Sequence, residues 1–76
     1  MKKTRKKFEK KLKERNLTVY RIAKIMGIDA PIAYYWLWGK SVPNIHNLIR
    51  LKEILNISGD ELLEMFAEEA TEGGAE

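Results

Sequence analysis

Apolar residues recur at helical spacing along most of the chain, and the pattern is sharpest in its first half. One face repeats at i, i+3, i+4 and i+7, as in an amphipathic helix, and consists of Val19, Ile22, Ala23 and Met26. Thr18 stands just before this face as a candidate N-cap. Gly27 predicts the end of the helix, because a residue without a Cβ adopts a positive φ at little cost.

A second short helix is predicted directly after the first. Asp29 is a suitable N-cap, because its carboxylate can accept from free N–H groups of the next turn, so the helix would begin near Ala30. Pro31 fits its first turn, where a missing N–H breaks no helical hydrogen bond. Gly39 predicts its end. The inward positions would be Ile32, Ala33, Trp36 and Leu37.

Two further helices are predicted before and after this pair. The earlier one would be capped by Thr4 and would bury the narrow stripe of Phe8 and Leu12. The later one would begin after Asn44 and end at Asn56, a residue that tolerates the left-handed conformation. Its broad apolar side consists of Ile45, Leu48, Ile49, Leu51, Ile54 and Leu55.

A fifth helix is predicted near the carboxyl end. Ser58 and Glu61 have the spacing of a capping box, and Leu62, Leu63 and Phe66 follow it, facing inward or toward a partner. Residues 67–76 are acidic and have no apolar periodicity, so we expect a disordered tail there. The pattern predicts no strand. We therefore expect an all-α fold, a compact five-helix bundle formed by residues 1–66.

Charge is distributed unevenly along the 76 residues, although the net charge is only +3. Nine Lys or Arg lie among the first 15 residues, whereas residues 60–76 contain seven Asp or Glu and no base. A basic front half is typical of proteins that bind a polyanion, and the alternative is a lysine face that only maintains solubility. No cysteine is present and no apolar run is long enough to span a membrane, so we expect a cytoplasmic protein.

Two short helices joined by a tight glycine turn resemble the helix-turn-helix of the Cro and phage-repressor family, also called the XRE type. The motif covers about residues 18–38, and the resemblance extends over roughly residues 8–66. It implies a lambda-repressor-like DNA-binding domain, in which Ala23 and Gly27 would let the two helices cross. The matching positions are Leu17, Thr18, Ile22, Ala23, Met26, Gly27, Ile28, Trp36, Gly39, Lys40, Pro43, Leu48, Leu51, Leu55, Ile57, Ser58, Asp60, Glu61 and Leu62.

The resemblance implies a transcriptional regulator that occupies duplex DNA as a repressor does. The positions that match the base-facing sites of the family are Ala30, Pro31, Tyr34 and Tyr35. Those expected near phosphates are Thr18, Arg21, Trp38, Lys40, Ser41 and Asn44. Ala30 and Pro31 depart from the family pattern, since they offer no hydrogen bonds to base edges. Readout would then depend on thymine methyl groups, on tyrosine and on DNA shape.

Other interpretations remain open from the sequence. A protein-interaction module, such as an antitoxin, an antirepressor or a partner of the transcription machinery, could use an aromatic face formed by Ile25, Pro31, Tyr34, Tyr35 and Trp38. An engineered or evolution-mimicking variant without activity would bind neither DNA nor protein. A homodimer would place on its interface Leu55, Ile57, Leu63, Met65 and Phe66. The alternative is that the fifth helix only covers its own domain.

Enzymatic chemistry is not expected. The single histidine, His46, has no cysteine near it in the chain and no carboxylate in its own predicted helix before Glu53. No glycine-rich phosphate loop and no metal-ligand spacing are present in the sequence. We therefore expect no catalytic residues, no metal, no cofactor, no small-molecule substrate and no membrane partner.

Overall fold

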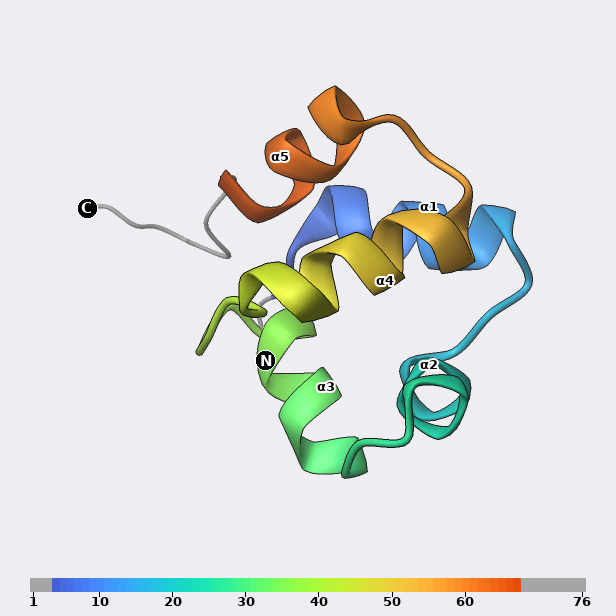
Figure 1. The fold of residues 1–76 in the computed structure, drawn as a ribbon. Coiled ribbons are helices and arrows are strands. Elements are labelled where there is room, and N and C mark those ends of the chain that lie inside the picture. Colours follow the sequence, from blue (N-terminus) through green and yellow to red (C-terminus); the bar gives the residue numbers. More distant parts are fainter. Residues whose placement is uncertain (1–3, 68–76) are drawn as a thin grey trace.

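The computed structural model describes residues 4–67, and within that range it contains helices and no strand. The predicted all-α chain of five helices is confirmed (Figure 1). Ala67 belongs to the last helix, and the rest of the predicted acidic tail lies outside the described residues. The helices are α1 (Lys6–Glu14), α2 (Val19–Met26), α3 (Ala30–Leu37), α4 (Ile45–Leu55) and α5 (Gly59–Ala67).

The first four helices end in the same way, with a residue of positive φ. Gly27, Gly39 and Asn56 were predicted as such stops, and their φ angles are 71°, 76° and 56°. Asn16, with φ 57°, plays the same part after α1. Each of these residues is followed by a residue whose amide donates to the carbonyl oxygen five residues back, which satisfies a free carbonyl of the last turn. The distances of these bonds are 2.8 Å from Leu17 to Leu12, 3.0 Å from Ile28 to Ala23, 2.9 Å from Lys40 to Tyr35 and 3.2 Å from Ile57 to Lys52.

Gly27 is required by this backbone conformation and not by a close helix crossing. A Cβ built on Gly27 meets no atom within 4 Å. Ala23, in contrast, is buried between the helices. The expectation that both small residues let α2 and α3 approach is therefore wrong for Gly27.

Side chains cap the starts of three helices as predicted. Thr18 Oγ1 accepts from the amide of Arg21 at 3.1 Å, and Asn44 Oδ1 accepts from the amide of Asn47 at 2.9 Å. At the start of α5, Ser58 Oγ accepts from the amide of Glu61 at 3.1 Å. In the predicted capping box the Glu61 carboxylate would accept from the backbone amide of Ser58. In the structure this carboxylate binds Lys11 on α1 at 2.9 Å.

Two predicted caps are wrong in their contacts. Asp29 occupies the N-cap position of α3, but its side chain accepts no capping hydrogen bond. Thr4 does not cap α1, because its hydroxyl donates to Glu9 Oε1 at 3.1 Å and the N-cap position belongs to Arg5. The free amides at the starts of α1 and α3 are therefore not capped by the side chains of Thr4 and Asp29.

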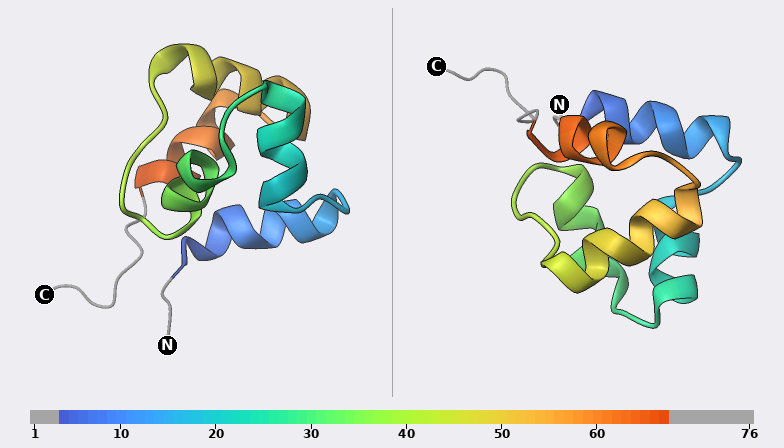
Figure 2. Two further views of the ribbon diagram at one scale, coloured as in Figure 1. Left: turned by 90° about the horizontal axis from the view of Figure 1, so that it is seen from below. Right: turned by 45° about the horizontal axis from the view of Figure 1, so that its top comes forward.

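The core lies where α2 and α3 meet the layer formed by α1, α4 and α5. In the left panel of Figure 2, α3 is seen end-on while α2 runs in the plane of the picture, so the pair crosses at a large angle. Helix α5 lies along α1, where the rings of Phe8 and Phe66 are 5.2 Å apart. The buried apolar residues are Phe8, Leu12, Val19, Ile22, Ala23, Met26, Ala33, Trp36, Leu51, Leu55, Ile57, Leu62 and Met65.

Several residues predicted to face the core point outward. Ile32 on α3 is 43% exposed, and Ile45 and Ile49 on α4 are 63% and 49% exposed. An apolar stripe read from spacing covers a wide arc of a helix, and a neighbouring helix covers only part of that arc. On these two helices the covered part is the one that contains Trp36 and Leu51.

Three arginines tie the helices together by donating to carbonyl oxygens at helix ends. Arg50 on α4 binds the end of α2, through Nη1 to Met26 at 3.1 Å. Arg15, just after α1, binds the end of α4, through Nε to Leu55 at 2.7 Å. Such carbonyls have no partner within their own helix, and they lie at the negative end of the helix dipole. Arg5, described below, does the same at the end of α3.

Candidate nucleic-acid interface

The four residues predicted to face bases lie along α3, at two levels of exposure. Pro31 and Tyr35 are exposed, whereas Ala30 and Tyr34 are half-buried. The indole ring of Trp38 lies 5.4 Å from the Tyr34 ring and 6.2 Å from the Tyr35 ring. The outer face of α3 therefore carries an aromatic cluster at its carboxyl end and a proline at its start.

The residues predicted near phosphates lie in three segments around α3. Thr18 and Arg21 are exposed at the start of α2, Lys40 and Ser41 are exposed in the connection between α3 and α4, and Asn44 is exposed at the start of α4. Trp38 is half-buried. The side-chain oxygens of Thr18 and Asn44 already accept a capping bond. The amide nitrogen of the Asn44 side chain remains as a donor to an anion.

The distribution of charge at the helix starts favours an anion near the starts of α2 and α4. Neither of these two helices has an acidic residue at its N-cap or in its first turn, whereas α3 has Asp29 at its N-cap and α5 has Asp60 and Glu61 in its first turn. A helix start carries partial positive charge that acidic residues normally offset. Within residues 4–67, the side chains of Arg21 and Lys40 make no ion pair or hydrogen bond. These two cations and the starts of α2 and α4 are therefore not neutralised by the described part of the chain.

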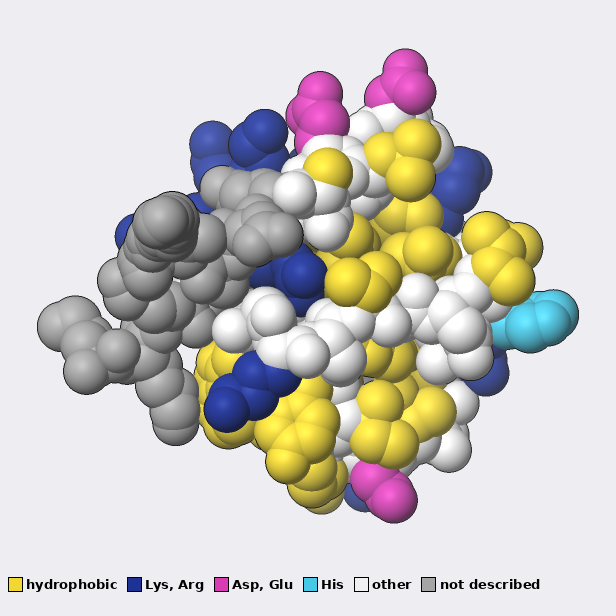
Figure 3. Space-filling model, turned by 90° about the vertical axis from the view of Figure 1, so that its left-hand side faces the viewer, with side chains coloured by type: hydrophobic (Ala, Val, Ile, Leu, Met, Phe, Trp, Pro, Cys, Tyr) yellow, Lys and Arg dark blue, Asp and Glu magenta, His cyan; other side chains and the backbone are white. Residues whose placement is uncertain are grey.

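Sequence reasoning missed part of the apolar surface around these residues. Ile32 on α3 is exposed beside Tyr35, three positions further along the same helix, and Ile25 on α2 is exposed as predicted. A second group of exposed apolar side chains, Val42, Ile45 and Ile49, lies before and along α4. Figure 3 views the side on which the connection between α3 and α4 lies, and hydrophobic side chains extend across it. The three-residue spacing of Ile32 and Tyr35 was the signal available in the sequence.

The predicted dimer surface is corrected by the burial of its members. Leu55, Ile57 and Met65 are buried in the core of the single chain and cannot form an exposed patch in this fold. Phe66 is half-buried against Phe8. Leu63 alone among the five is well exposed, at 63%. The physical reason is that the α5 face packs on α1 and α4, so its apolar side is already covered.

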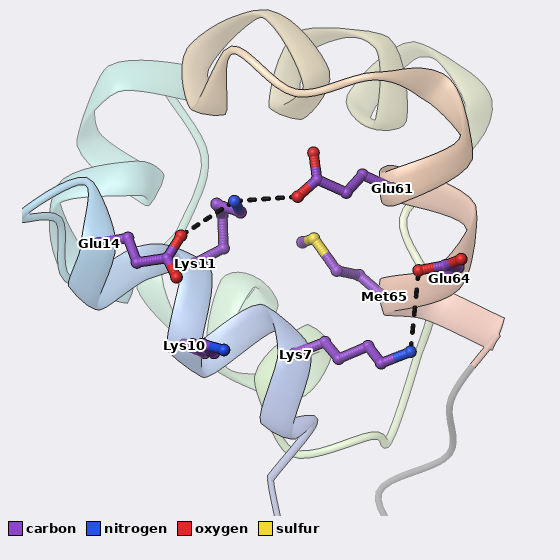
Figure 4. A pocket seen from close by; sticks show the side chains of 7 residues that line it. All are labelled: Lys7, Lys10, Lys11, Glu14, Glu61, Glu64 and Met65. Atoms are coloured by element: carbon purple, nitrogen blue, oxygen red, sulfur yellow. Dashed lines mark ion pairs between the residues drawn. The ribbon is translucent and has the colours of Figure 1, made fainter.

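The lysines of α1 do not all face solvent as free charges. A shallow groove between α1 and α5, floored by Met65, is crossed by ion pairs between the two helices (Figure 4). Lys11 Nζ lies 2.9 Å from Glu61 Oε2 and 3.0 Å from Glu14 Oε1. Lys7 Nζ lies 3.8 Å from Glu64 Oε1. Part of the basic character of α1 is therefore balanced by α5 and is not available to a polyanion.

The ion pairs of Lys11 alter the pKa of two of these side chains, Lys11 and Glu14. Glu61, followed by Glu14, raises the pKa of Lys11 above its ordinary value of 10.5. Lys11 in turn lowers the pKa of Glu14 below its ordinary value of 4.5. Lys11 and Glu14 thus stay charged over a wider pH range than they would alone.

No protein-family model, no curated protein and no solved structure matches the chain. Among residues 4–67, no three His, Cys, Asp or Glu side chains gather in a group that could hold a metal ion. No helix of this described part is long and apolar enough to cross a membrane. The interpretation of the site therefore depends on the geometry of its own residues.

Proposed function

We propose that this protein binds double-stranded DNA through a helix-turn-helix formed by α2 and α3, and regulates transcription as a repressor does, by occupying its site. The observation that carries the proposal is the set of uncompensated positive groups around α3. The starts of α2 and α4, which have no acidic residues, and the cations Arg21 and Lys40 lie around a helix whose outer face is exposed. The three-residue turn between Met26 and Ala30, with its glycine, fits the same motif.

In this proposal the residues around α3 bind the DNA backbone. Arg21, at the start of α2, and Lys40, after α3, each neutralise a phosphate. Ser41 and Asn44 donate hydrogen bonds to phosphate oxygens near the start of α4. Thr18 lies at the same helix start as Arg21, and Trp38 supports the neighbouring tyrosine rings. These contacts fix the orientation of the domain and carry no sequence information themselves.

The outer face of α3 would then enter the major groove. Ala30, Pro31 and the additional Ile32 offer methyl and methylene groups, which suit the C5 methyl of thymine. Tyr34 and Tyr35 add hydroxyl groups that bind a base acceptor or a phosphate. Such a face distinguishes A·T from G·C better than it distinguishes among all four base pairs, because it has few bidentate donors and acceptors. We therefore expect a preference for A·T-rich sites.

A charge-reversal pair tests the backbone contacts. Lys40→Glu is expected to abolish binding to a fluorescent duplex, measured by anisotropy at low salt. Lys13→Glu is the matched control, because Lys13 is exposed in the last turn of α1, at the opposite end of the molecule from the α3–α4 connection (Figure 1). Both variants change the net charge equally. Equal losses of affinity would indicate unspecific attraction and would contradict the proposed site.

A second function is favoured by one specific observation, the extent of exposed apolar surface. Ile25, Ile32 and Tyr35 are exposed in the proposed motif, and Val42, Ile45 and Ile49 add to the apolar surface near α4. Such surfaces are typical of protein interfaces. Binding to a protein through them would barely respond to salt, whereas DNA binding would weaken steeply. An engineered or evolution-mimicking variant without activity would bind neither DNA nor a protein partner.

A further inference from the structure

Arg5 is buried at the junction of four segments, although it belongs to the most basic part of the chain. Its side chain is 4% exposed at the N-cap position of α1. Nη1 donates to the carbonyl oxygens of Trp36, in the last turn of α3, and of Ser41, at 3.0 Å for the second bond. The guanidinium also lies over the ring of Phe66 on α5, with 5.2 Å between Cζ and the ring centre. One side chain thus joins α1, α3, α5 and the connection that follows α3.

The two carbonyls that Arg5 binds flank the segment with the proposed phosphate contacts. Lys40 stands between them in the chain, and Ser41 supplies one of them. A single nitrogen bonded to both oxygens fixes how far the connection can move from the end of α3. The carbonyl of Ser41 points toward the buried guanidinium, so the backbone at Ser41 is fixed by a hydrogen bond on the side that faces the protein interior. Lys40 and the Ser41 side chain remain exposed on the outside.

We propose that Arg5 is a positioning residue, which holds Lys40 and Ser41 in the geometry that binds a DNA phosphate. The inference rests on the proposed function and adds to it a residue that does not touch DNA. Its basis is that hydrogen bonds from a charged donor are strong when they are shielded from water. A loosened connection would have to be ordered at the moment of binding, and the free energy of that ordering would reduce the affinity.

Substitution of Arg5 can separate this role from general stability. The backbone amide of Arg5 donates to the carbonyl of Leu37 at 2.7 Å, and a methionine or lysine at this position keeps that donor. Arg5→Met removes the guanidinium and keeps most of the apolar stem. Arg15→Met is the matched control, because Arg15 also donates to carbonyls at a helix end, at Leu55 and Asn56 of α4. The two variants lose the same charge and the same kind of cap, and only the first affects the α3–α4 connection.

The experiment measures duplex affinity by anisotropy at low salt for the full chain, together with 15N relaxation of the Val42 amide. We expect Arg5→Met to weaken binding roughly tenfold, the effect of losing about one charged hydrogen bond. We expect Arg15→Met to remain within about twofold of the original chain. The Val42 amide should become mobile only in Arg5→Met, because it shares a peptide unit with the Ser41 carbonyl, whereas the Lys40 and Ser41 amides keep their bonds to the Tyr35 carbonyl. Arg5→Lys should recover part of the affinity, because an ammonium group can still reach one carbonyl.

A double variant provides a readout that a purely structural role would not change. If Arg5 acts through Lys40, then Arg5→Met should add little to the loss already caused by Lys40→Ala. Additive losses, or equal losses in Arg5→Met and Arg15→Met, would overturn the inference while the DNA-binding proposal stands. An original chain that binds no duplex at low salt would overturn the proposed function, and the positioning role of Arg5 with it.

Discussion

Arg50 on α4 donates through Nη1 to the carbonyl oxygen of Met26, the last residue of α2, at 3.1 Å. Its second terminal nitrogen reaches the carbonyl of Ile25 at 3.5 Å. This contact satisfies acceptors that α2 cannot satisfy by itself, and it sets the end of α2 against α4. Since Gly27 follows directly, the same contact holds the start of the turn that leads into α3.

Removal of this cap should destabilise the fold measurably. We expect Arg50→Met to lower the free energy of unfolding by about 1–2 kcal/mol, because two partly exposed carbonyls lose a charged donor. Urea unfolding followed by circular dichroism measures the change. Arg21→Met is the control, since the Arg21 side chain is exposed and should stay within about 0.5 kcal/mol. An Arg50 variant as stable as the Arg21 variant would show that the cap contributes nothing.

Gly27, in the turn between α2 and α3, predicts that a larger residue there would strain the backbone without clashing with other atoms. Gly27→Ala should cost about 1 kcal/mol, because φ is 71° and a Cβ there is strained even though it meets no other atom. Gly27→Asn should cost less, since asparagine tolerates this conformation, as Asn16 and Asn56 do here. Gly59→Ala is the comparison, in open space at the start of α5, and should be neutral or stabilising by up to about 1 kcal/mol. Thermal unfolding would rank the three variants, and a neutral Gly27→Ala would contradict the argument.

Burial predicts opposite results for two leucines that the sequence pattern placed on one dimer surface. Leu55→Ala should cost about 2–5 kcal/mol, because its side chain is fully buried in the core of one chain. Leu63→Ala should change stability by less than about 0.5 kcal/mol, because its side chain is largely exposed. Urea unfolding at two protein concentrations measures both. If unfolding of the original chain depended on its concentration and Leu63→Ala destabilised it, Leu63 would have to be buried between two chains.

The ion pairs between α1 and α5 predict a pH dependence with a defined sign. The pKa of Glu14 is lowered, so its contribution to stability is present above pH 4.5 and is lost as pH falls through the lower folded-state value. The pKa of Lys11 is raised, so its contribution is complete below pH 10.5 and is lost as pH rises through the higher folded-state value. The melting temperature should therefore have a plateau between these limits.

Lys11→Met should lower that plateau and reduce the loss of stability on acidification. Lys13→Met serves as the control on the same helix, because no ion pair connects Lys13 to α5 among the described residues. Thermal melts of both variants across the acidic range provide the comparison. An acid transition of unchanged size in Lys11→Met would mean that these pairs do not account for it.

The local signals in the sequence predicted most of the helix boundaries. Glycine and asparagine stops at Gly27, Gly39 and Asn56, and the caps Thr18 and Asn44, are decided by residues within one turn. Such contacts depend on the conformation of a few neighbouring residues, so a pattern in the chain is sufficient to find them. Asp29 shows the limit, since its position was correct and its hydrogen bond was not.

The long-range contacts could not be predicted in this way. Arg5 reaches Trp36 and Arg15 reaches Leu55 across 31 and 40 positions, and no local pattern marks an arginine that will turn inward. The exposure of Ile32 and Ile49 is likewise decided by where neighbouring helices end, and not by spacing along their own helix. At the candidate site, the motif proposed the individual residues, whereas the hydrogen bond from Arg5 to the Ser41 carbonyl could be seen only in the structure.

The central claim is that the positive groups around α3 bind DNA phosphates, and the dependence of duplex binding on salt tests it most directly. Anisotropy titrations with random and A·T-rich duplexes, from low to physiological salt, give the slope of log affinity against log salt. Contacts to about four to six phosphates predict a slope of roughly −4 to −5, with tighter binding to the A·T-rich duplex. No binding at the lowest salt, or an affinity that does not change with salt, would contradict the claim.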